Sequence, residues 1–359
     1  MIEKRDYQTR IIERAIRAID EGHRHILIEA PTGSGKTVIG HLIAKALHER
    51  HGWRSGWTAM RRHLLHQAAE MNRQMLGFEH IRYFSTFDSD PPTGIDLLID
   101  DEAQHSASET ATDLYNRLQP KVVIGLSATP FRTDRMKLCY SKTIRDAGIR
   151  SLIDQKWLSP FHQYVFDEEW TRANVAKVYL MEPARWGKSV MYFLTLNECD
   201  QCAQMLQTGG VRCEVVHGSS DQTAQIESFQ QGKLDVLLNV IVLTEGFDCA
   251  DLKTVFVRPG SRGPTMQMVG RVLRKHPEKP HAQVVQNNRT SWPFTKIASA
   301  EAKFLLADHA WVSRACVTEK ITHAQTNTLL AIAQIPVHLP AKLLRRPKRR
   351  RAPLPGSQF

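Results

Sequence analysis

Short apolar runs alternate with amphipathic stretches along most of the chain. Three of these runs have the length of buried strands: HILIEA (25–30), IDLLID (95–100) and VVIGLSATP (122–130). The first leads into a glycine-rich loop, after which a helix is predicted from Lys36 to about Arg50. Strands that alternate with helices are typical of parallel α/β layers. The pattern predicts one doubly wound domain over residues 1–160.

The pattern restarts after residue 160. The next strand-like runs are SVMYFL (189–194), CEVVHG (213–218), DVLLNVIV (235–242) and TVFVRP (254–259). Helices are expected between them, up to about Gln207 and from about Gln222 to Gln231. These elements predict a second α/β domain over residues 161–290, followed by a mostly helical extension over 291–340.

The composition is that of an ordinary globular protein. Of the 359 residues, 42% are hydrophobic and 24% are charged, which suits two domains with sizeable cores and excludes wholesale disorder. The amino terminus has no apolar signal-peptide core, and no run approaches the roughly 18–20 apolar residues of a membrane span. We therefore expect a cytoplasmic protein without a membrane partner.

Positive charge is concentrated at the carboxyl end. Residues 341–359 hold 7 of the net 11 positive charges and no acidic side chain, and proline and glycine interrupt them. The stretch is expected to be a flexible basic tail. It either keeps the protein soluble or tethers phosphate groups, and the nucleotide motifs described next favour the tether.

The six cysteines are scattered, unlike the dense framework of small disulfide-rich domains. Cys199 and Cys202 form a CxxC within a segment of helical periodicity, and no second pair lies at the spacing of a zinc ribbon. We interpret the pair as two helix residues, with a metal site as the alternative.

The segment APTGSGKT, residues 30–37, follows a predicted strand and opens a predicted helix. In this context a GSGKT turn is typical of a P-loop, in which backbone N–H groups and the helix amino terminus surround nucleotide phosphates. Lys36 adds a positive charge for the β and γ phosphates, and Thr37 offers a hydroxyl to Mg²⁺. The other loop residues expected to contact the nucleotide are Thr32, Gly33, Ser34 and Gly35.

Asp101 and Glu102 stand at the end of another predicted strand. Hydrolysis of ATP needs one carboxylate that holds the metal ion, here Asp101, and another that orients or deprotonates the attacking water, here Glu102. Together with the P-loop, the pair predicts a site for ATP and Mg²⁺.

These two segments, with others in the same order along the chain, resemble superfamily 2 helicases and translocases of the DExH type. The likeness is greatest to the branch of type III restriction motor subunits and XPB-like DNA translocases, and it spans about residues 5–290. It implies an α/β fold of two tandem RecA-like parallel-sheet domains, with a small helical C-terminal extension and a basic tail. It also implies that Arg5, Tyr7 and Gln8 read the adenine base.

Several further segments resemble nucleic-acid contacts of that family: TAMRRHLLHQ (58–67), YFSTF (83–87), HGSS (217–220) and TEGFD (244–248). The contacts that the resemblance assigns are Arg61, Arg62, Gln67, Ser85, Thr86, His217, Gly218 and Thr244. SATPFR (127–132) resembles the segment that links the ATP site to the nucleic acid. The residues assigned to this coupling are Gln104, Ser127 and Thr129.

QMVGRVLR (267–274) resembles the last motif of the family. Arg271 and Arg274 are three positions apart, so on a helix they would project from one face. By resemblance they reach the γ-phosphate as arginine fingers, so that ATP binding closes the two domains and hydrolysis releases them. The other nucleotide contacts assigned to the second domain are Gly246, Asp248 and Gln267.

Two positions depart from the family pattern. Gln104 stands where this branch usually has histidine, which leaves the strength of coupling open, although glutamine still donates and accepts hydrogen bonds. Gln222 and Gln225 stand where an arginine is common, which leaves one phosphate contact open. Three tryptophans are either base-stacking residues or core and hinge residues: Trp157, Trp186 and Trp292.

The leading hypothesis is a monomeric, ATP-dependent helicase or translocase on single-stranded or forked DNA, with ATP and Mg²⁺ as cofactors. DNA is favoured over RNA because the DNA-working relatives carry the resemblance. One alternative is a DNA-binding or strand-annealing module with weak ATPase activity, in which the basic tail is decisive. Another is a motor subunit that serves a separate nuclease, or a repair or replication partner.

Overall fold

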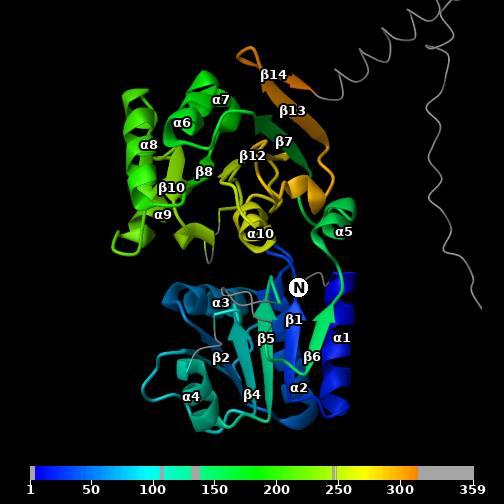
Figure 1. Ribbon diagram of the computed structural model, residues 1–359. Coiled ribbons are helices and arrows are strands. Elements are labelled where there is room, and N and C mark those ends of the chain that lie inside the picture. Colours follow the sequence, from blue (N-terminus) through cyan, green and yellow to red (C-terminus); the bar gives the residue numbers. More distant parts are fainter. Residues whose placement is uncertain (1–4, 106–108, 131–137, 245–246, 248, 314–359) are drawn as a thin grey trace, which may run out of the picture. The chain divides into compact units, whose positions relative to one another are not determined.

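The computed structural model describes residues 5–105, 109–130, 138–244, 247 and 249–313 (Figure 1). Residues 1–311 form one compact unit and residues 312–359 a second. The last described strand ends in the second unit, and all other described helices and strands belong to the first. The predicted basic tail and the predicted extension from residue 314 onward lie outside the described residues. None of the described helices has the length and apolarity that crossing a bilayer requires.

The first sheet has six strands in the order β3-β2-β4-β5-β1-β6, and every pair is parallel. The strands are β1 (His25–Glu29), β2 (Ser55–Ala59), β3 (Ile81–Ser85), β4 (Leu97–Asp101), β5 (Val122–Ser127) and β6 (Lys142–Arg145). The helices of this part are α1 (Asp6–Asp20), α2 (Lys36–His51), α3 (Arg62–Met75), α4 (Glu109–Leu118) and α5 (Ile149–Asp154). Because the strands are parallel, the carboxyl ends of β1 and β4 meet at the same edge of the sheet, where open α/β sheets bind ligands.

The second sheet has eight strands in the order β14-β13-β7-β12-β11-β8-β10-β9. The strands are β7 (Phe161–Phe166), β8 (Ser189–Tyr192), β9 (Cys213–Val216), β10 (Val236–Asn239), β11 (Thr254–Val257), β12 (Ala282–Asn287), β13 (Ala302–Ala307) and β14 (Ala310–Ser313). The helices are α6 (Arg172–Met181), α7 (Pro183–Trp186), α8 (Leu196–Thr208), α9 (Gln222–Gln230) and α10 (Arg262–Gly270), with short 3₁₀ turns η1 (Val242–Thr244) and η2 (Phe294–Lys296). Two mostly parallel sheets with helices confirm the predicted α/β class.

Most predicted elements are present, with shorter ends. The helix expected from Lys36 is α2, and α8 and α9 lie where helices were expected. The strand predicted over 235–242 stops at Asn239, because the Asn239 side-chain oxygen accepts the N–H of Leu243 at 3.2 Å and η1 follows. Side-chain bonding of this kind competes with the strand ladder and ends it.

The helical pattern predicted from residue 291 is wrong for residues 302–313, which form β13 and β14. β13 pairs parallel with β7 and alternates between half-buried and exposed side chains. Phe304 on its inner face stacks on Tyr164 of β7, with ring centroids 4.7 Å apart. Pairing with β7 and aromatic packing across the two strands outweigh the local helical pattern.

The core of the second sheet contains Cys199, Cys202 and Trp186. Both thiols are free, and burial raises the pKa of Cys199 to about 12 and also raises that of Cys202. Both cysteines are buried residues of α8, so the interpretation as helix residues is confirmed. Trp186 is fully buried, which excludes base stacking by this side chain.

Candidate nucleotide-binding site

The P-loop connects β1 to α2 in the first sheet. Gly33 and Gly35 have φ angles of 82° and 79°, a left-handed conformation that favours glycine. Lys36 is the first residue of α2, and its side chain is 9% exposed. The loop therefore turns into the helix as the sequence predicts, with the lysine at the helix amino terminus.

Residues at the beginning of α1 hold the P-loop through hydrogen bonds. The Tyr7 hydroxyl and the Gln8 side-chain amide both donate to the Ser34 carbonyl, the latter at 3.1 Å. The Gln8 side-chain oxygen accepts the Arg5 N–H at 3.2 Å. The amide nitrogen of Gln8 thus holds the loop and its oxygen caps the start of α1, and the reading of adenine by this residue stays a prediction.

Asp101 and Glu102 lie at the end of β4. Glu102 has a φ of 55°, which is costly for a residue with a side chain and recurs at functional sites. One of its oxygens lies 4.0 Å from the Lys36 ammonium, and the other accepts from the Gln104 amide at 3.0 Å. The carboxylate is therefore fixed between the P-loop lysine and a neutral donor.

Burial and nearby charges shift the pKa values of the two acids in opposite directions. Burial raises the pKa of Asp101 to about 7, the adjacent Glu102 carboxylate adds to the rise, and Lys36 opposes it. Burial also raises the pKa of Glu102, but Lys36 and Arg271 outweigh it and hold that pKa below its usual value. Additional positive charge beside Asp101 would therefore lower its pKa and favour the ionised carboxylate. With the Thr37 hydroxyl it forms a set of hard oxygen ligands that fits Mg²⁺.

A chain of hydrogen bonds leads from Glu102 into the next strand end. The Gln104 side-chain oxygen accepts from the Ser127 hydroxyl at 2.5 Å, and the Ser127 hydroxyl oxygen accepts the Thr129 N–H at 3.1 Å. Gln104 can make both of its contacts at once because an amide has a donor and an acceptor end. The three residues predicted for coupling are therefore contiguous with the catalytic candidate.

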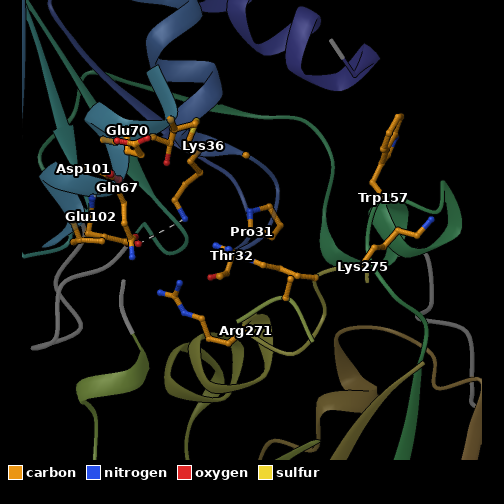
Figure 2. A pocket seen from close by; sticks show the side chains of 18 of the residues that line it. Pro31, Thr32, Lys36, Gln67, Glu70, Asp101, Glu102, Trp157, Arg271 and Lys275 are labelled. Atoms are coloured by element: carbon orange, nitrogen blue, oxygen red, sulfur yellow. Dashed lines mark hydrogen bonds and ion pairs between the residues drawn. The ribbon is translucent and has the colours of Figure 1, made fainter. Parts of the chain in front are cut away.

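A cavity of about 780 Å³ is lined by residues from both sheets, a volume within the range of small-molecule sites (Figure 2). The predicted nucleotide-site residues that line it are Arg5, Thr32, Gly33, Gly35, Lys36, Thr37, Asp101, Glu102, Arg271 and Arg274. Four other predicted nucleotide contacts are not among the lining residues: Tyr7, Gln8, Ser34 and Gln267. Gly246 and Asp248 lie outside the described residues.

The two arginines reach the cavity differently than predicted. α10 ends at Gly270, so Arg271 caps the helix and Arg274 lies in the turn beyond it. The N–H and hydroxyl of Ser159 donate to the carbonyls of Leu273 and Arg274, at 2.8 and 3.2 Å. These bonds engage carbonyls at the turn and stabilise the exit from the helix. Arg271 is only 7% exposed, and its side chain points into the cavity in Figure 2.

Two residues that were not predicted as nucleotide contacts also line the cavity, Trp157 and Lys275. The Arg5 guanidinium lies 4.8 Å from the centre of the Trp157 ring. Figure 2 shows Trp157 and Lys275 on one side of the cavity and Asp101 and Glu102 on the other. The sequence shows Trp157 only as an aromatic residue between the two predicted domains, and a residue at such a place could equally contact nucleic acid.

Most predicted nucleic-acid contacts lie away from this cavity. Arg61 donates to the Val242 carbonyl at 3.3 Å, and Arg62 begins α3 with an exposed side chain. The Thr86 hydroxyl is buried and bonded to that of Thr58 at 3.2 Å. Thr244 ends η1. Gln67, in contrast, lines the nucleotide cavity.

The loop with His217 and Gly218 is held by the two glutamines that depart from the family pattern. The Gln222 amide donates to the His217 carbonyl at 3.0 Å, and the Gln225 amide donates to the Val215 carbonyl at 3.1 Å. Both side chains therefore shape the loop through its backbone. Ser85, the remaining contact of this group, ends β3.

Two family models match the chain. The one described as the res subunit of type III restriction enzymes matches residues 1–90, and the helicase conserved C-terminal domain matches residues 172–276. The chain is 25% identical to the putative ATP-dependent helicase IRC3 of Saccharomyces cerevisiae, over 78% of this chain and 51% of the relative. It is 24% identical to the putative mitochondrial ATP-dependent helicase irc3 of Schizosaccharomyces pombe, over 77% and 55%. The chain thus spans about half the length of these curated relatives.

Solved structures share the fold at 16% sequence identity. The Type ISP restriction-modification enzyme LlaBIII bound to DNA has a TM-score of 0.58, covering 82% of this chain and 28% of that one. Dbp5 of S. cerevisiae bound to RNA and ADP BeF3 also has a TM-score of 0.58, covering 77% and 82%. This likeness confirms the predicted pair of RecA-like sheets.

Proposed function

We propose, from the premise that the chain belongs to superfamily 2 of the helicases, that it hydrolyses ATP to drive movement along nucleic acid. The observation that carries the proposal is the shared cavity, where the P-loop lysine and paired acids of the first sheet face Arg271 from the second. A site split in this way is complete only when both sheets contribute to it.

The first-sheet residues take the hydrolytic roles in this proposal. Lys36 and the loop N–H groups bind the phosphates, and Glu102 orients the attacking water and accepts its proton. Held by the Thr37 hydroxyl and the Asp101 carboxylate, Mg²⁺ would neutralise phosphate charge. When the Lys36 ammonium turns to the phosphates, Glu102 loses the ion pair with Lys36 and becomes a stronger base.

Arg271 and Arg274 complete the site from the second sheet. Their positive charges stabilise the charge that develops on the transferred phosphoryl group. Gly270, next to Arg271, lies against Thr32 of the P-loop, where an added Cβ would be 2.7 Å from the Thr32 Cβ. In the proposal, the negative charge of the γ-phosphate attracts both arginines towards the loop. Loss of this charge after hydrolysis permits the two sheets to separate.

Trp157 and Arg5 form the base end of the site in this proposal. The indole offers a flat face, and the guanidinium beside it supplies a cation. Stacking on the indole does not distinguish adenine from other bases, because every base has a flat face. Selection for adenine would therefore need a contact from another residue to the edge of the base.

DNA is the favoured substrate because the type ISP restriction-modification enzyme that shares the fold is bound to DNA, and the family model matched at residues 1–90 is also of a restriction enzyme. An RNA-bound protein shares the fold to the same degree, so the fold itself does not choose between the two. In this proposal the motor works as a monomer. Copurification of other proteins with the chain is the test for a nuclease or repair partner.

The test is the steady-state ATPase rate of the purified chain with single-stranded DNA, duplex DNA, forked DNA and RNA, beside strand displacement on the forked substrate. We expect stimulation by DNA above that by RNA, and loss of the stimulated rate in Lys36→Ala. An ATPase rate that responds to none of the nucleic acids contradicts the motor, and stimulation by RNA alone contradicts the choice of DNA.

A further inference from the structure

We infer that His162, His281 and Glu301 form a binding site for a zinc ion in the second sheet, outside the nucleotide cavity. One ring nitrogen of each histidine and one carboxylate oxygen of Glu301 lie within 4.8 Å of one another. None of the three lines the nucleotide cavity. The proposed site is therefore independent of the proposed ATPase.

The sheet brings the three residues together through its parallel register. His162 is the second residue of β7, which lies between β12 and β13. His281 immediately precedes β12, and Glu301 immediately precedes β13. The N–H of Glu301 donates to the Phe161 carbonyl at 2.9 Å, and the N–H of Ala282 donates to the Pro160 carbonyl at 2.8 Å. These bonds fix the backbone on both sides of β7, so the ligands start from rigid elements.

The distance between two of the ligands suits a tetrahedral ion. His162 Nε2 lies 3.3 Å from a Glu301 carboxylate oxygen. Two ligands at the usual zinc distances of roughly 2.0–2.1 Å are about 3.3–3.4 Å apart in tetrahedral geometry. The His162 and His281 rings stack with centroids 3.6 Å apart, and one nitrogen of each lies within 4.8 Å of the other. Because the lone pair of an imidazole lies in the plane of its ring, the His281 ring has to turn out of the stack for both rings to bind one ion. The Glu301 side chain is 57% exposed, so it can adjust and leaves an entry path for the ion.

The chemistry of the three groups also favours a borderline metal. Two imidazoles and one carboxylate are a known ligand set for Zn²⁺, with water in the fourth position. Lys253 repels a cation near His281, and the Glu301 carboxylate offsets this repulsion.

Packing holds the His162 ring in place. Phe304 of β13 lies 5.6 Å from it, centroid to centroid, and His281 stacks on it. A ring fixed by its neighbours loses less entropy on binding an ion. Zinc would join the starts of three strands near Ser159, which bonds to the turn that carries Arg274. The expected effect is stabilisation of the second sheet, with no part in hydrolysis.

The test is titration of the chelator-treated full chain with ZnCl₂ in the absence of nucleotide. We expect one saturable zinc ion per chain and an increase in Tm that EDTA reverses. His281→Ala and Glu301→Gln should each weaken binding at least about tenfold and abolish the increase in Tm. His309→Ala, an exposed histidine before β14, is the matched control and should bind like the wild type.

Co²⁺ as a probe identifies the ligands. A visible absorption band without a thiolate charge-transfer band is expected, because the site contains no cysteine. Absence of saturable zinc binding, affinity unchanged in both variants, or a thiolate band would each overturn the proposal. The basal ATPase rate of His281→Ala should equal that of the wild type, so the fate of the zinc site does not depend on the motor proposal.

Discussion

The two sheets contribute to the shared cavity in different ways. The first supplies buried side chains whose pKa values are shifted, with Asp101 and Glu102 at the end of β4. Among the described residues that line the cavity, the second sheet supplies positive charge and no carboxylate. On the proposed function this difference implies a division of work: proton transfer and metal binding would belong to the first sheet, and stabilisation of the transition state to the second.

Replacement of Glu102 should have the largest effect. Glu102→Gln keeps the shape of the side chain but removes the base, so we expect the ATPase kcat to fall about a thousandfold. The matched control is Glu70→Gln, because Glu70 is another carboxylate that lines the same cavity but has no assigned role. Similar losses in both variants would argue that general negative charge, and not Glu102, is what the cavity needs.

The contact between α10 and the P-loop should come next. Gly270→Ala places a methyl group 2.7 Å from the Thr32 Cβ and keeps the second sheet from its position against the loop. We expect kcat to fall about tenfold to a hundredfold, since small displacements of catalytic groups have effects of that size. Gly263→Ala lies on the same helix with no atom within 4 Å of the new methyl group, and should leave the rate unchanged.

Trp157→Ala should change binding more than chemistry. Loss of a stacking face costs about 1–3 kcal/mol per base, so we expect the KM for ATP to rise at least about fivefold while kcat is nearly unchanged. Trp157→Phe retains an aromatic face and should restore most of the affinity. A normal KM in the alanine variant would show that the base binds elsewhere.

The smallest expected effect is on stability in mild acid. His41 in α2 bonds to the Thr37 carbonyl and the Tyr83 hydroxyl, and burial lowers its pKa from 6.5 to about 4. The unfolded chain therefore binds more protons between these values, and stability falls as the pH decreases from 6.5 towards 4. At pH 5 the loss is about 2 kcal/mol relative to pH 7.

His41→Gln removes this titration while an amide can still form hydrogen bonds. The difference in Tm between pH 7 and pH 5 should be smaller in this variant than in the wild type. An equal difference in both proteins would mean that His41 is not the group that responds to acid.

Local motifs predicted the first sheet's contribution well, because the P-loop and the acids sit within a few residues of strand ends. Gln104 was predicted by resemblance to be a coupling residue, yet its simultaneous bonds to Glu102 and Ser127 depend on two strands being adjacent. Arg274 was expected on the helix because nothing local signals the Ser159 bonds that accompany the turn. β13 was missed because a strand of six residues is stabilised by its pairing with β7 more than by its own pattern.

The most direct test of the shared site is single-turnover ATP hydrolysis by Arg271→Ala, with ATP affinity measured separately. The account predicts that the rate of hydrolysis falls about a thousandfold while affinity changes much less, because the guanidinium acts on charge that develops in the transition state. Arg262→Ala, an exposed arginine at the start of α10 that does not line the cavity, should hydrolyse ATP at the wild-type rate. Hydrolysis by Arg271→Ala at that same rate would contradict an ATPase site shared by the two sheets.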